Sequence, residues 1–325
     1  MNIPAVFYHC FTEAELSAFG KTDLGAARDM LDYCRKSDID IVTYGDDDYP
    51  KYLREIPTPP VCLFVKGKLP DTAASPSITI VGTRECSERG KKLTAKMAYD
   101  LSSQGFCIVS GMARGIDSIA QRAALEQGGK TFAVLGCGVD VCYPASGRQL
   151  YEKILETGGG ILSTFPPGMQ PLKKMFPQRN RIVAGLSDVL LVVEARHRSG
   201  TLITVDMALE QGKNVYAVPG RLTDRLSDGC NLLIRQGAGI ALTPEDILAE
   251  LAVLQNRREI GKPREKEKGL ITILDFVPKT ADQILTELRK TGREAELTEV
   301  LEGLMELCLE GKAMQIAGSF ARTAK

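Results

Sequence analysis

The sequence predicts an α/β protein with a doubly wound, mostly parallel sheet, because two kinds of segment alternate from residue 78 onward. Short apolar runs rich in valine and isoleucine end in glycine or another small residue, and helical stretches separate them. Strands that are apolar on both faces are typical of parallel sheets covered by helices. Six such runs predict a Rossmann-like domain over residues 71–254. The runs are ITIVGT (78–83), FCIVSG (106–111), TFAVLG (131–136), GGILSTF (159–165), DVLLVVEA (188–195) and NVYAVPG (214–220).

Residues 1–70 show a different pattern, which predicts a short N-terminal helical segment and a connecting region. A helical pattern covers residues 13–37. The polar, proline-rich stretch at 45–60 cannot continue as one helix. The run VCLFVKG (61–67) then predicts a short strand that closes the segment.

Three further segments follow the six predicted strands. Residues 229–251 predict a helix, a short strand and a second helix that begins at Thr243-Pro244-Glu245. Residues 255–269 carry nine charges in fifteen positions and predict a charged linker. Residues 270–325 predict three helices and a small hairpin, which is the order of a winged-helix domain. Because this segment has seven basic and nine acidic residues, we expect it to contact protein or its own chain rather than to read DNA.

Composition and residue spacing argue against several classes of protein. The chain of 325 residues is 44% apolar and has 41 basic and 41 acidic side chains, as in an ordinary globular protein. No apolar run approaches the ~20 residues that span a bilayer, and the start of the chain lacks a signal-peptide pattern. We therefore expect a cytoplasmic protein without a membrane partner. Nine cysteines without a C-x-x-C pair, together with only two histidines, argue against a metal site.

Two glycine patterns resemble nucleotide-binding loops, but their context does not fit. GGKT (128–131) lacks the earlier glycine of a P-loop, where Ala124 stands, and it runs from helix into strand. GCG (136–138) follows a strand, but the third glycine of a dinucleotide fingerprint would fall on Val141. Neither pattern supports ATP or NAD binding, so no cofactor is predicted.

Glycines and cationic residues gather just after the predicted strand ends, where open parallel sheets bind ligands. Glycines there let backbone N–H groups approach an anion, and the start of a helix adds partial positive charge. A plain turn is the commoner explanation of a single glycine, whereas an arginine beside each loop favours an anionic ligand. The candidate binding residues are Gly82, Thr83, Arg84, Ser110, Gly111, Arg114, Gly115, Lys173, Lys174, Phe176, Arg179, Asn180, Arg181, Ser199, Gly200 and Thr201.

The stretch KKMFPQRNR (173–181) concentrates positive charge in a chain whose net charge is zero. Four of its nine residues are cationic and none is acidic. A loop that extends to Pro177 is predicted to precede a helix over residues 179–188, between the fourth and fifth strands. The charges are therefore expected at the same edge of the sheet as Arg84.

Two interpretations of this stretch remain open at the level of sequence. A solvated basic loop would have the same charges. Phe176 favours nucleic acid, because an aromatic ring among cations can stack on a base while the cations hold phosphates. Arg84 and the lysines are assigned to the ligand, whereas Arg179 and Arg181 are equally suited to pinning neighbouring loops.

The motifs occur in an order that resembles the DNA-processing protein A family, also called DprA or Smf. The resemblance covers residues 41–325 and rests on IVGTR, SGMARGID, FPQRNRIVAGLSD, SGTLIT, VYAVPG and GCNLLIRQGA. The helical N-terminal module of the family is shortened here. The resemblance implies a protein that binds single-stranded DNA without sequence preference, protects incoming DNA in natural transformation and helps to load the RecA recombinase. It also implies a homodimer through the Rossmann-like domain and no enzymatic activity.

The same resemblance implies particular roles for individual residues. It places Arg84, Phe176 and either Lys173 or Lys174 in a pocket that holds the strand. Two adjacent lysines leave the match of the family's lysine ambiguous. Three further residues are expected to line the same rim, namely Gly111, Arg114 and Gly115.

The alternative is an enzyme of the nucleotide phosphoribohydrolase type, which shares the Rossmann-like layout. These enzymes have a P-G-G-x-G-T-x-x-E pattern, whose glutamate assists cleavage of the base from the sugar. In SGTLIT (199–204) the corresponding position is Thr204, which has no carboxylate for general acid–base catalysis. Asp117 and Glu194 remain as possible acid or base groups.

Overall fold

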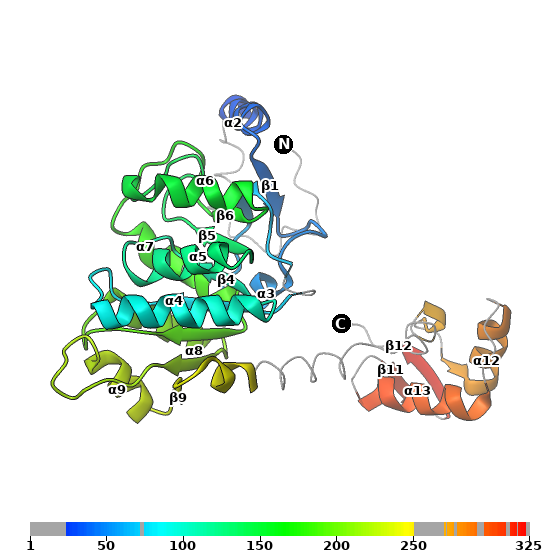
Figure 1. Cartoon of the computed structure of the whole chain (residues 1–325). Helices are drawn as coiled ribbons and strands as arrows, with labels where there is room; N and C mark the ends of the chain where they lie inside the picture. Colours follow the sequence, from blue (N-terminus) through cyan, green and yellow to red (C-terminus); the bar gives the residue numbers. More distant parts are fainter. Residues whose placement is uncertain are drawn as a thin grey trace, which may run out of the picture. The chain divides into compact units, whose positions relative to one another are not determined.

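The computed structural model describes residues 24–71, 75–249, 270, 272–275, 278–290, 296–309, 313–316 and 318–322 (Figure 1). The chain divides into two compact units at residues 251 and 252. In the described part of the first unit, nine strands form one sheet in the order β1-β2-β6-β5-β4-β3-β7-β8-β9.

The six predicted strands form the centre of this sheet, and each runs parallel to its neighbours among the six. They are β3 (Ser77–Val81), β4 (Cys107–Ser110), β5 (Thr131–Val134), β6 (Gly160–Ser163), β7 (Val189–Val192) and β8 (Asn214–Ala217). All residues of β3 to β7 are buried, as strands covered on both faces require. The predicted Rossmann-like fold is confirmed.

Alternate side chains of the central strands pack into different helix layers, because successive residues of a strand point to opposite faces. In β5, Ala133 belongs to a core with residues of α6, whereas Phe132 and Val134 pack with residues of α3 and α7. Figure 1 shows α4, α5 and α6 in front of the sheet. The helices of this unit with full bounds are α2 (Leu24–Lys36), α3 (Lys51–Arg54), α4 (Glu88–Ser103), α5 (Ile116–Glu126), α6 (Arg148–Glu156), α7 (Met175–Gly185), α8 (Gly200–Glu210) and α9 (Asp228–Arg235).

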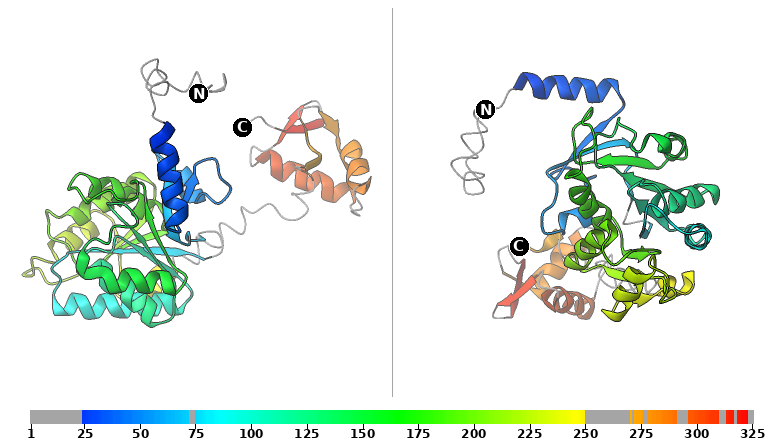
Figure 2. Two further views of the ribbon diagram at one scale, coloured as in Figure 1. Left: turned by 90° about the horizontal axis from the view of Figure 1, so that it is seen from above. Right: turned by 90° about the vertical axis from the view of Figure 1, so that its left-hand side faces the viewer.

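The sheet extends across the domain boundary that the sequence predicted between residues 70 and 71. Strands β1 (Asp40–Thr43) and β2 (Cys62–Gly67) form an antiparallel pair, and β2 also pairs antiparallel with β6. Figures 1 and 2 show α2 beside β1 at this end of the sheet. The sequence pattern identified VCLFVKG as a strand, but one of its two partners, β6, lies far along the chain. At the other end, β9 (Gly239–Ile240) lies parallel to β8.

The helix α7 begins earlier than the sequence predicted. Its first residue is Met175, so Pro177 lies inside the first turn rather than at the end of a loop. Proline is tolerated there because the N–H groups of a first helical turn have no partner within the helix. Phe176 and Arg179 are therefore three residues apart on one helix, and side chains at that spacing share a helix face.

The described residues of the second unit include two helices with full bounds and a three-stranded antiparallel sheet in the order β10-β12-β11. Their core contains Ile284, Leu288, Leu304 and Phe320. The elements are β10 (Lys279–Thr280), α12 (Ala281–Lys290), α13 (Leu297–Leu309), β11 (Ala313–Ile316) and β12 (Ser319–Arg322). The first of the three helices predicted in residues 270–325 is only partly described, and the predicted linker (255–269) lies outside the described residues. The winged-helix assignment stays a prediction.

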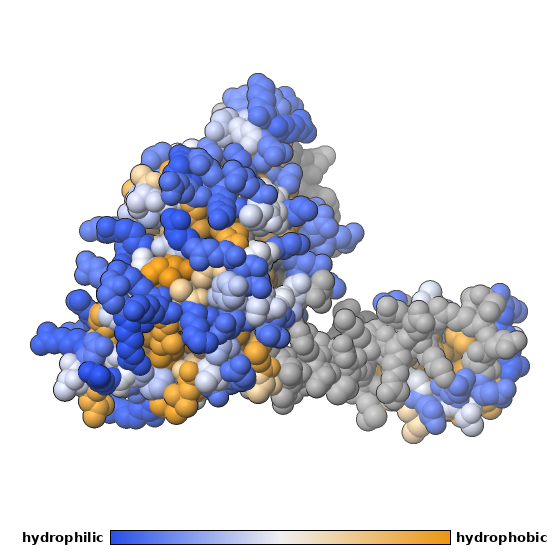
Figure 3. Space-filling view, in the orientation of Figure 1, coloured by the Kyte–Doolittle hydropathy of each residue, from blue (hydrophilic) through white to orange (hydrophobic). Residues whose placement is uncertain are grey.

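The surface carries mainly polar side chains on the face that Figure 3 displays, and apolar side chains emerge between them. Within the described part of the chain, no helix combines the length and the apolar content needed to cross a membrane.

Candidate functional site

A cleft of about 670 Å³ lies at the carboxyl ends of the central strands. The chain runs from β3 to β4, β5 and β6 on one side, and continues with β7 and β8 on the other side of β3. Ligands of open α/β sheets bind where the strand order reverses in this way. The loops after β3, β4 and β7 contribute to the lining, together with the start of α7.

The cleft brings most of the predicted binding residues together. Twelve of the sixteen belong to its lining, namely Gly82, Thr83, Arg84, Gly111, Arg114, Lys173, Phe176, Arg179, Asn180, Ser199, Gly200 and Thr201. They come from four separate segments, which meet because the carboxyl ends of parallel strands share one edge of the sheet. Of the two adjacent lysines, Lys173 lines the cleft, whereas Lys174 is exposed at the N-terminal cap of α7.

Two of the predicted binding residues, Ser110 and Gly115, do not line the cleft but stabilise the loops that form it. Ser110 is fully buried, and its hydroxyl donates a hydrogen bond of 2.8 Å to the carbonyl of Ile80. Gly115 is the N-cap of α5 with φ at 81°. A Cβ atom at Gly115 would lie 2.3 Å from the carbonyl oxygen of Thr83, so glycine allows the two loops to touch.

Arg181 points to the N-terminal part of the chain rather than into the cleft. Its Nη1 donates to the hydroxyl of Thr58, and its backbone carbonyl accepts a hydrogen bond of 3.1 Å from the side chain of Gln211. Arg181 is therefore placed to hold the connecting region against α7.

Arg179 lines the cleft, but its guanidinium is committed to the protein. The residue is only 5% exposed, and its Nη1 donates to the backbone carbonyls of Gly111 and Val134. Its Nε donates to the side chain of Asn180 at 3.1 Å. Burial lowers the pKa of Arg179, and the nearby carboxylate of Asp117 opposes this shift. Arg179 thus ties α7 to the ends of β4 and β5.

The two carboxylates that remained as possible acid or base groups of an enzyme, those of Asp117 and Glu194, both accept hydrogen bonds from neighbouring segments of the protein. Asp117 is 6% exposed, and its Oδ2 accepts a hydrogen bond of 3.2 Å from the backbone N–H of Gly111. Burial raises the pKa of Asp117, and the charge of Arg179 opposes the shift. The carboxylate of Glu194 accepts hydrogen bonds from the backbone N–H and the hydroxyl of Ser87, at the start of α4.

An aromatic and cationic cluster forms one wall of the cleft. The Cζ atoms of Arg84 and Arg179 lie over the ring of Phe176, 5.7 and 6.0 Å from its centroid. The ring centroid of Tyr143 lies 5.6 Å from that of Phe176, with 40° between the ring planes. Tyr143 was not among the predicted binding residues, because the loop after the third predicted strand carries only a glycine pattern that does not fit a nucleotide-binding loop. Applying the strand-end rule to that loop would have found it.

The charges of the cleft favour an anionic ligand. Its lining contains five cationic side chains and two carboxylates, namely Arg84, Arg114, Lys173, Arg179, Arg196, Glu85 and Asp117. Arg196 belongs to the loop after β7 and was not among the predicted binding residues. Excess positive charge in a cleft raises the local concentration of a polyanion.

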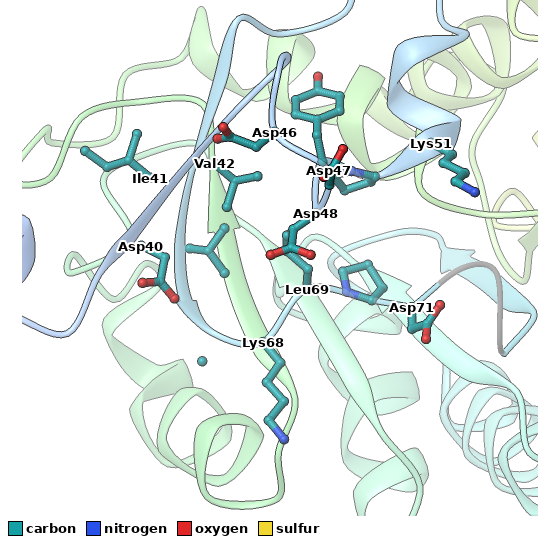
Figure 4. A pocket seen from close by; sticks show the side chains of 15 residues that line it. Asp40, Ile41, Val42, Asp46, Asp47, Asp48, Lys51, Lys68, Leu69 and Asp71 are labelled. Carbon is teal, nitrogen blue, oxygen red and sulfur yellow. The ribbon is translucent and has the colours of Figure 1, made fainter.

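A second pocket, of about 730 Å³, has the opposite charge (Figure 4). Five aspartates and two lysines line it between β1, β2 and the segment before α3, namely Asp40, Asp46, Asp47, Asp48, Asp71, Lys51 and Lys68. Among the described residues, no group of three or more His, Cys, Asp and Glu side chains is placed to hold a metal ion. A polyanion would be repelled here and attracted to the cleft at the strand ends.

Comparison with known proteins connects the fold and the cleft to one family. Residues 40–252 match the family model described as DNA recombination-mediator protein A. The DNA processing protein DprA of Streptococcus pneumoniae is 48% identical over 205 residues, which cover 63% of this chain and 72% of the relative. The protein Smf of Escherichia coli is 42% identical over 289 residues, which cover 87% and 77%.

Two solved structures are similar to this chain. The X-ray structure of DNA processing protein A from Streptococcus pneumoniae has a TM-score of 0.66 and 41% identity, and the match covers 77% of this chain and 83% of that one. The DNA processing protein A from Helicobacter pylori, described with a unique single-stranded DNA binding mode, has a TM-score of 0.59 and 30% identity. That match covers 66% of this chain and 95% of the other.

The contact between Arg179 and Gly111 generates a stability prediction. A Cβ atom at Gly111 would lie 2.2 Å from Nη1 of Arg179, so Gly111→Ala should lower the free energy of unfolding by about 1–3 kcal/mol. Gly200→Ala is the matched control, because a Cβ atom there meets no atom of the described residues within 4 Å. The control should change stability by less than about 0.5 kcal/mol. Urea unfolding followed by circular dichroism measures both variants, and equal stability of Gly111→Ala and wild type would contradict the packing described for Arg179.

Proposed function

The chain belongs to the DNA recombination-mediator protein A family, and on that premise we propose that its cleft binds single-stranded DNA without sequence preference. The observation that carries the proposal is the position of Arg84 and Lys173 beside Phe176 at one edge of the sheet. Cations beside an aromatic ring are the combination that holds phosphates and stacks bases. The relative from Helicobacter pylori, which is described with a single-stranded DNA binding mode, supports the same function.

The proposal includes a cellular role that rests on the family. We propose that the protein works in the cytoplasm, protects single strands that enter during natural transformation and helps to load the RecA recombinase onto them. The relatives named DNA processing protein DprA support this role. Binding without bond cleavage fits the cleft, because Asp117 is held by Gly111 and Thr204 occupies the position of the hydrolase glutamate.

We further propose that two copies of the chain form a homodimer through the β9 end of the first unit. Two apolar side chains are exposed there, because Ile240 is 48% and Leu242 is 67% exposed. Within the described sheet, β9 has β8 as its neighbour and marks the end of the strand order. Two clefts in one dimer can hold the same strand, which raises the effective concentration for the second contact.

Single strands should bind more tightly than duplex of the same length. A duplex hides the faces of its bases, whereas an unpaired base that stacks on an aromatic ring gains ~1–3 kcal/mol. Fluorescence anisotropy with single-stranded and duplex oligonucleotides of mixed sequence measures the difference. Equal affinity for the two forms would reject the proposed function.

Removal of cleft cations should weaken binding to all sequences and flatten its dependence on salt. For Arg84→Ala and Lys173→Ala, each lost phosphate contact should reduce the slope of log K against log salt by ~0.7 for single strands. Lys68→Ala is the matched control, because this lysine lines the acidic pocket instead. If the cleft variants keep the wild-type slope while remaining folded, their charges do not contact phosphates.

A charge at the β9 end should separate the proposed dimer. Leu242→Glu should give a monomer that binds short oligonucleotides normally and long ones more weakly, since one cleft then acts alone. Val61→Glu is the control, because Val61 is 80% exposed but precedes β2 near the opposite end of the strand order. Light scattering gives the mass, and anisotropy gives the affinities. A wild-type monomer at tens of micromolar, or undiminished binding of long strands by Leu242→Glu, would exclude the shared-strand arrangement.

A further inference from the structure

One carboxylate joins two loops at the strand ends, the loop after β5 (135–144) and the loop after β6 (164–174). Asp140 belongs to the first loop, and the backbone N–H of Gly168 belongs to the second. That N–H donates to both carboxylate oxygens of Asp140, at 2.8 and 3.0 Å. Neither Asp140 nor Gly168 belongs to the cleft lining, so the connection lies outside the cleft itself.

The backbones of the two loops also touch beside Asp140. The N–H of Gly138 donates a hydrogen bond of 2.9 Å to the carbonyl of Met169. A Cβ atom at Gly138 would lie 2.7 Å from Oδ1 of Asp140 and 2.8 Å from the backbone nitrogen of Gly168. The carboxylate of Asp140 thus occupies the space that a side chain at Gly138 would need, and the two loops form one packed unit at this point.

Each of the two loops contributes one side chain to the cleft. Tyr143 lies three residues after Asp140, Lys173 lies five residues after Gly168, and both line the cleft. The ring centroid of Tyr143 lies 5.6 Å from that of Phe176. Because ordering a loop costs conformational entropy, a loop that is already held in place loses less of its freedom when a ligand binds.

Helix α2 reaches the same carboxylate from the N-terminal part of the chain. The hydroxyl of Tyr33 on α2 donates a hydrogen bond of 2.8 Å to Oδ2 of Asp140. This hydrogen bond raises the pKa of Tyr33, so the hydroxyl remains a protonated donor at neutral pH. The neighbouring Asp32 pairs with Arg35 of its own helix instead, at 3.6 Å.

We infer that Asp140 is a positioning residue for strand binding, which holds the loops that present Tyr143 and Lys173 to the strand, and that Tyr33 connects α2 to these loops. The inference rests on the proposed function of the cleft. The charge of Asp140 by itself has the opposite effect, because a carboxylate near the cleft repels a polyanion. Removing the carboxylate therefore tightens binding if only its charge matters, and weakens binding if it positions the loops.

The test compares two substitutions of Asp140 by titration with a short oligothymidylate, followed by fluorescence anisotropy. Asp140→Ala should weaken binding about three- to tenfold, because the hydrogen bonds that hold the loops are lost. Asp140→Asn removes the same charge but keeps an oxygen that can accept from the N–H of Gly168. It should bind within about twofold of wild type or more tightly.

Combined substitutions separate positioning from a merely structural role, because residues that act through one another have effects that do not add. Lys173→Ala removes a proposed phosphate contact directly, so Asp140→Ala should weaken binding by a smaller factor in that background than in wild type. Tyr33→Phe should weaken binding about two- to threefold by itself. It should cause no further loss in the Asp140→Ala background.

One matched variant controls for the loss of a carboxylate on α2. Asp32→Ala removes a side chain that is 61% exposed and pairs with Arg35, and it should leave the affinity within about twofold of wild type. Circular dichroism compares the thermal unfolding of each variant with wild type. If Asp140→Ala does not fold, Tyr33→Phe decides, because it keeps the contact of Asp140 with Gly168, and unchanged binding would then overturn the inference.

The outcomes distinguish the inference from the proposed function. Unchanged or tighter binding by folded Asp140→Ala, a loss that Asp140→Asn does not restore, or equal losses with and without Lys173 would overturn the positioning role while the cleft remains a strand-binding site. Failure of the wild-type protein to bind the oligonucleotide would reject the proposed function, and the inference with it. A loss that Asp140→Asn restores and that shrinks in the Lys173→Ala background supports the inference.

Discussion

The buried guanidinium of Arg179 is the interaction on which the geometry of the cleft depends. It reaches from α7 to the carbonyls of Gly111 and Val134, at the ends of two neighbouring strands. A charged group with 5% exposure needs partners at fixed positions, so it sets the distance between the helix and the sheet. Phe176 lies on the same helix face, and its ring is therefore placed against Arg84 by the same anchor.

The cationic side chains near the cleft have different roles, and their burial determines which role each one has. Arg179 and Arg181 make hydrogen bonds within the protein, whereas Arg84, Lys173 and Arg196 are exposed in the cleft lining. The chain has no net charge, yet cations gather in this cleft and carboxylates in the pocket beside β1. A net charge of zero is therefore compatible with two regions of opposite charge. The positions of the charged residues in the fold determine which ligand each region favours.

Features of the fold that depend on a short stretch of sequence could be predicted from the sequence. Apolar runs on both faces predicted the six central strands, and the rule that strand ends share an edge predicted twelve residues of the cleft lining. Contacts between segments that are far apart in the sequence could not be predicted. The antiparallel pairing of β2 with β6 has no local signature. The early start of α7 was missed because proline was treated as the end of a loop, and the inward turn of Arg179 depends on carbonyls from two other strands.

The pairing of β2 with β6 also affects the order in which the first unit can form during synthesis. Phe64 pairs with Ser163, so β2 leaves the ribosome about a hundred residues before its partner exists, roughly 5–20 s at bacterial rates of translation. Throughout that interval Leu63, Phe64 and Val65, all buried in the finished sheet, have no sheet to cover them. The nascent chain therefore carries an apolar strand without its β6 partner during about two fifths of the synthesis of this unit, which is the period when a chaperone would have the most to protect.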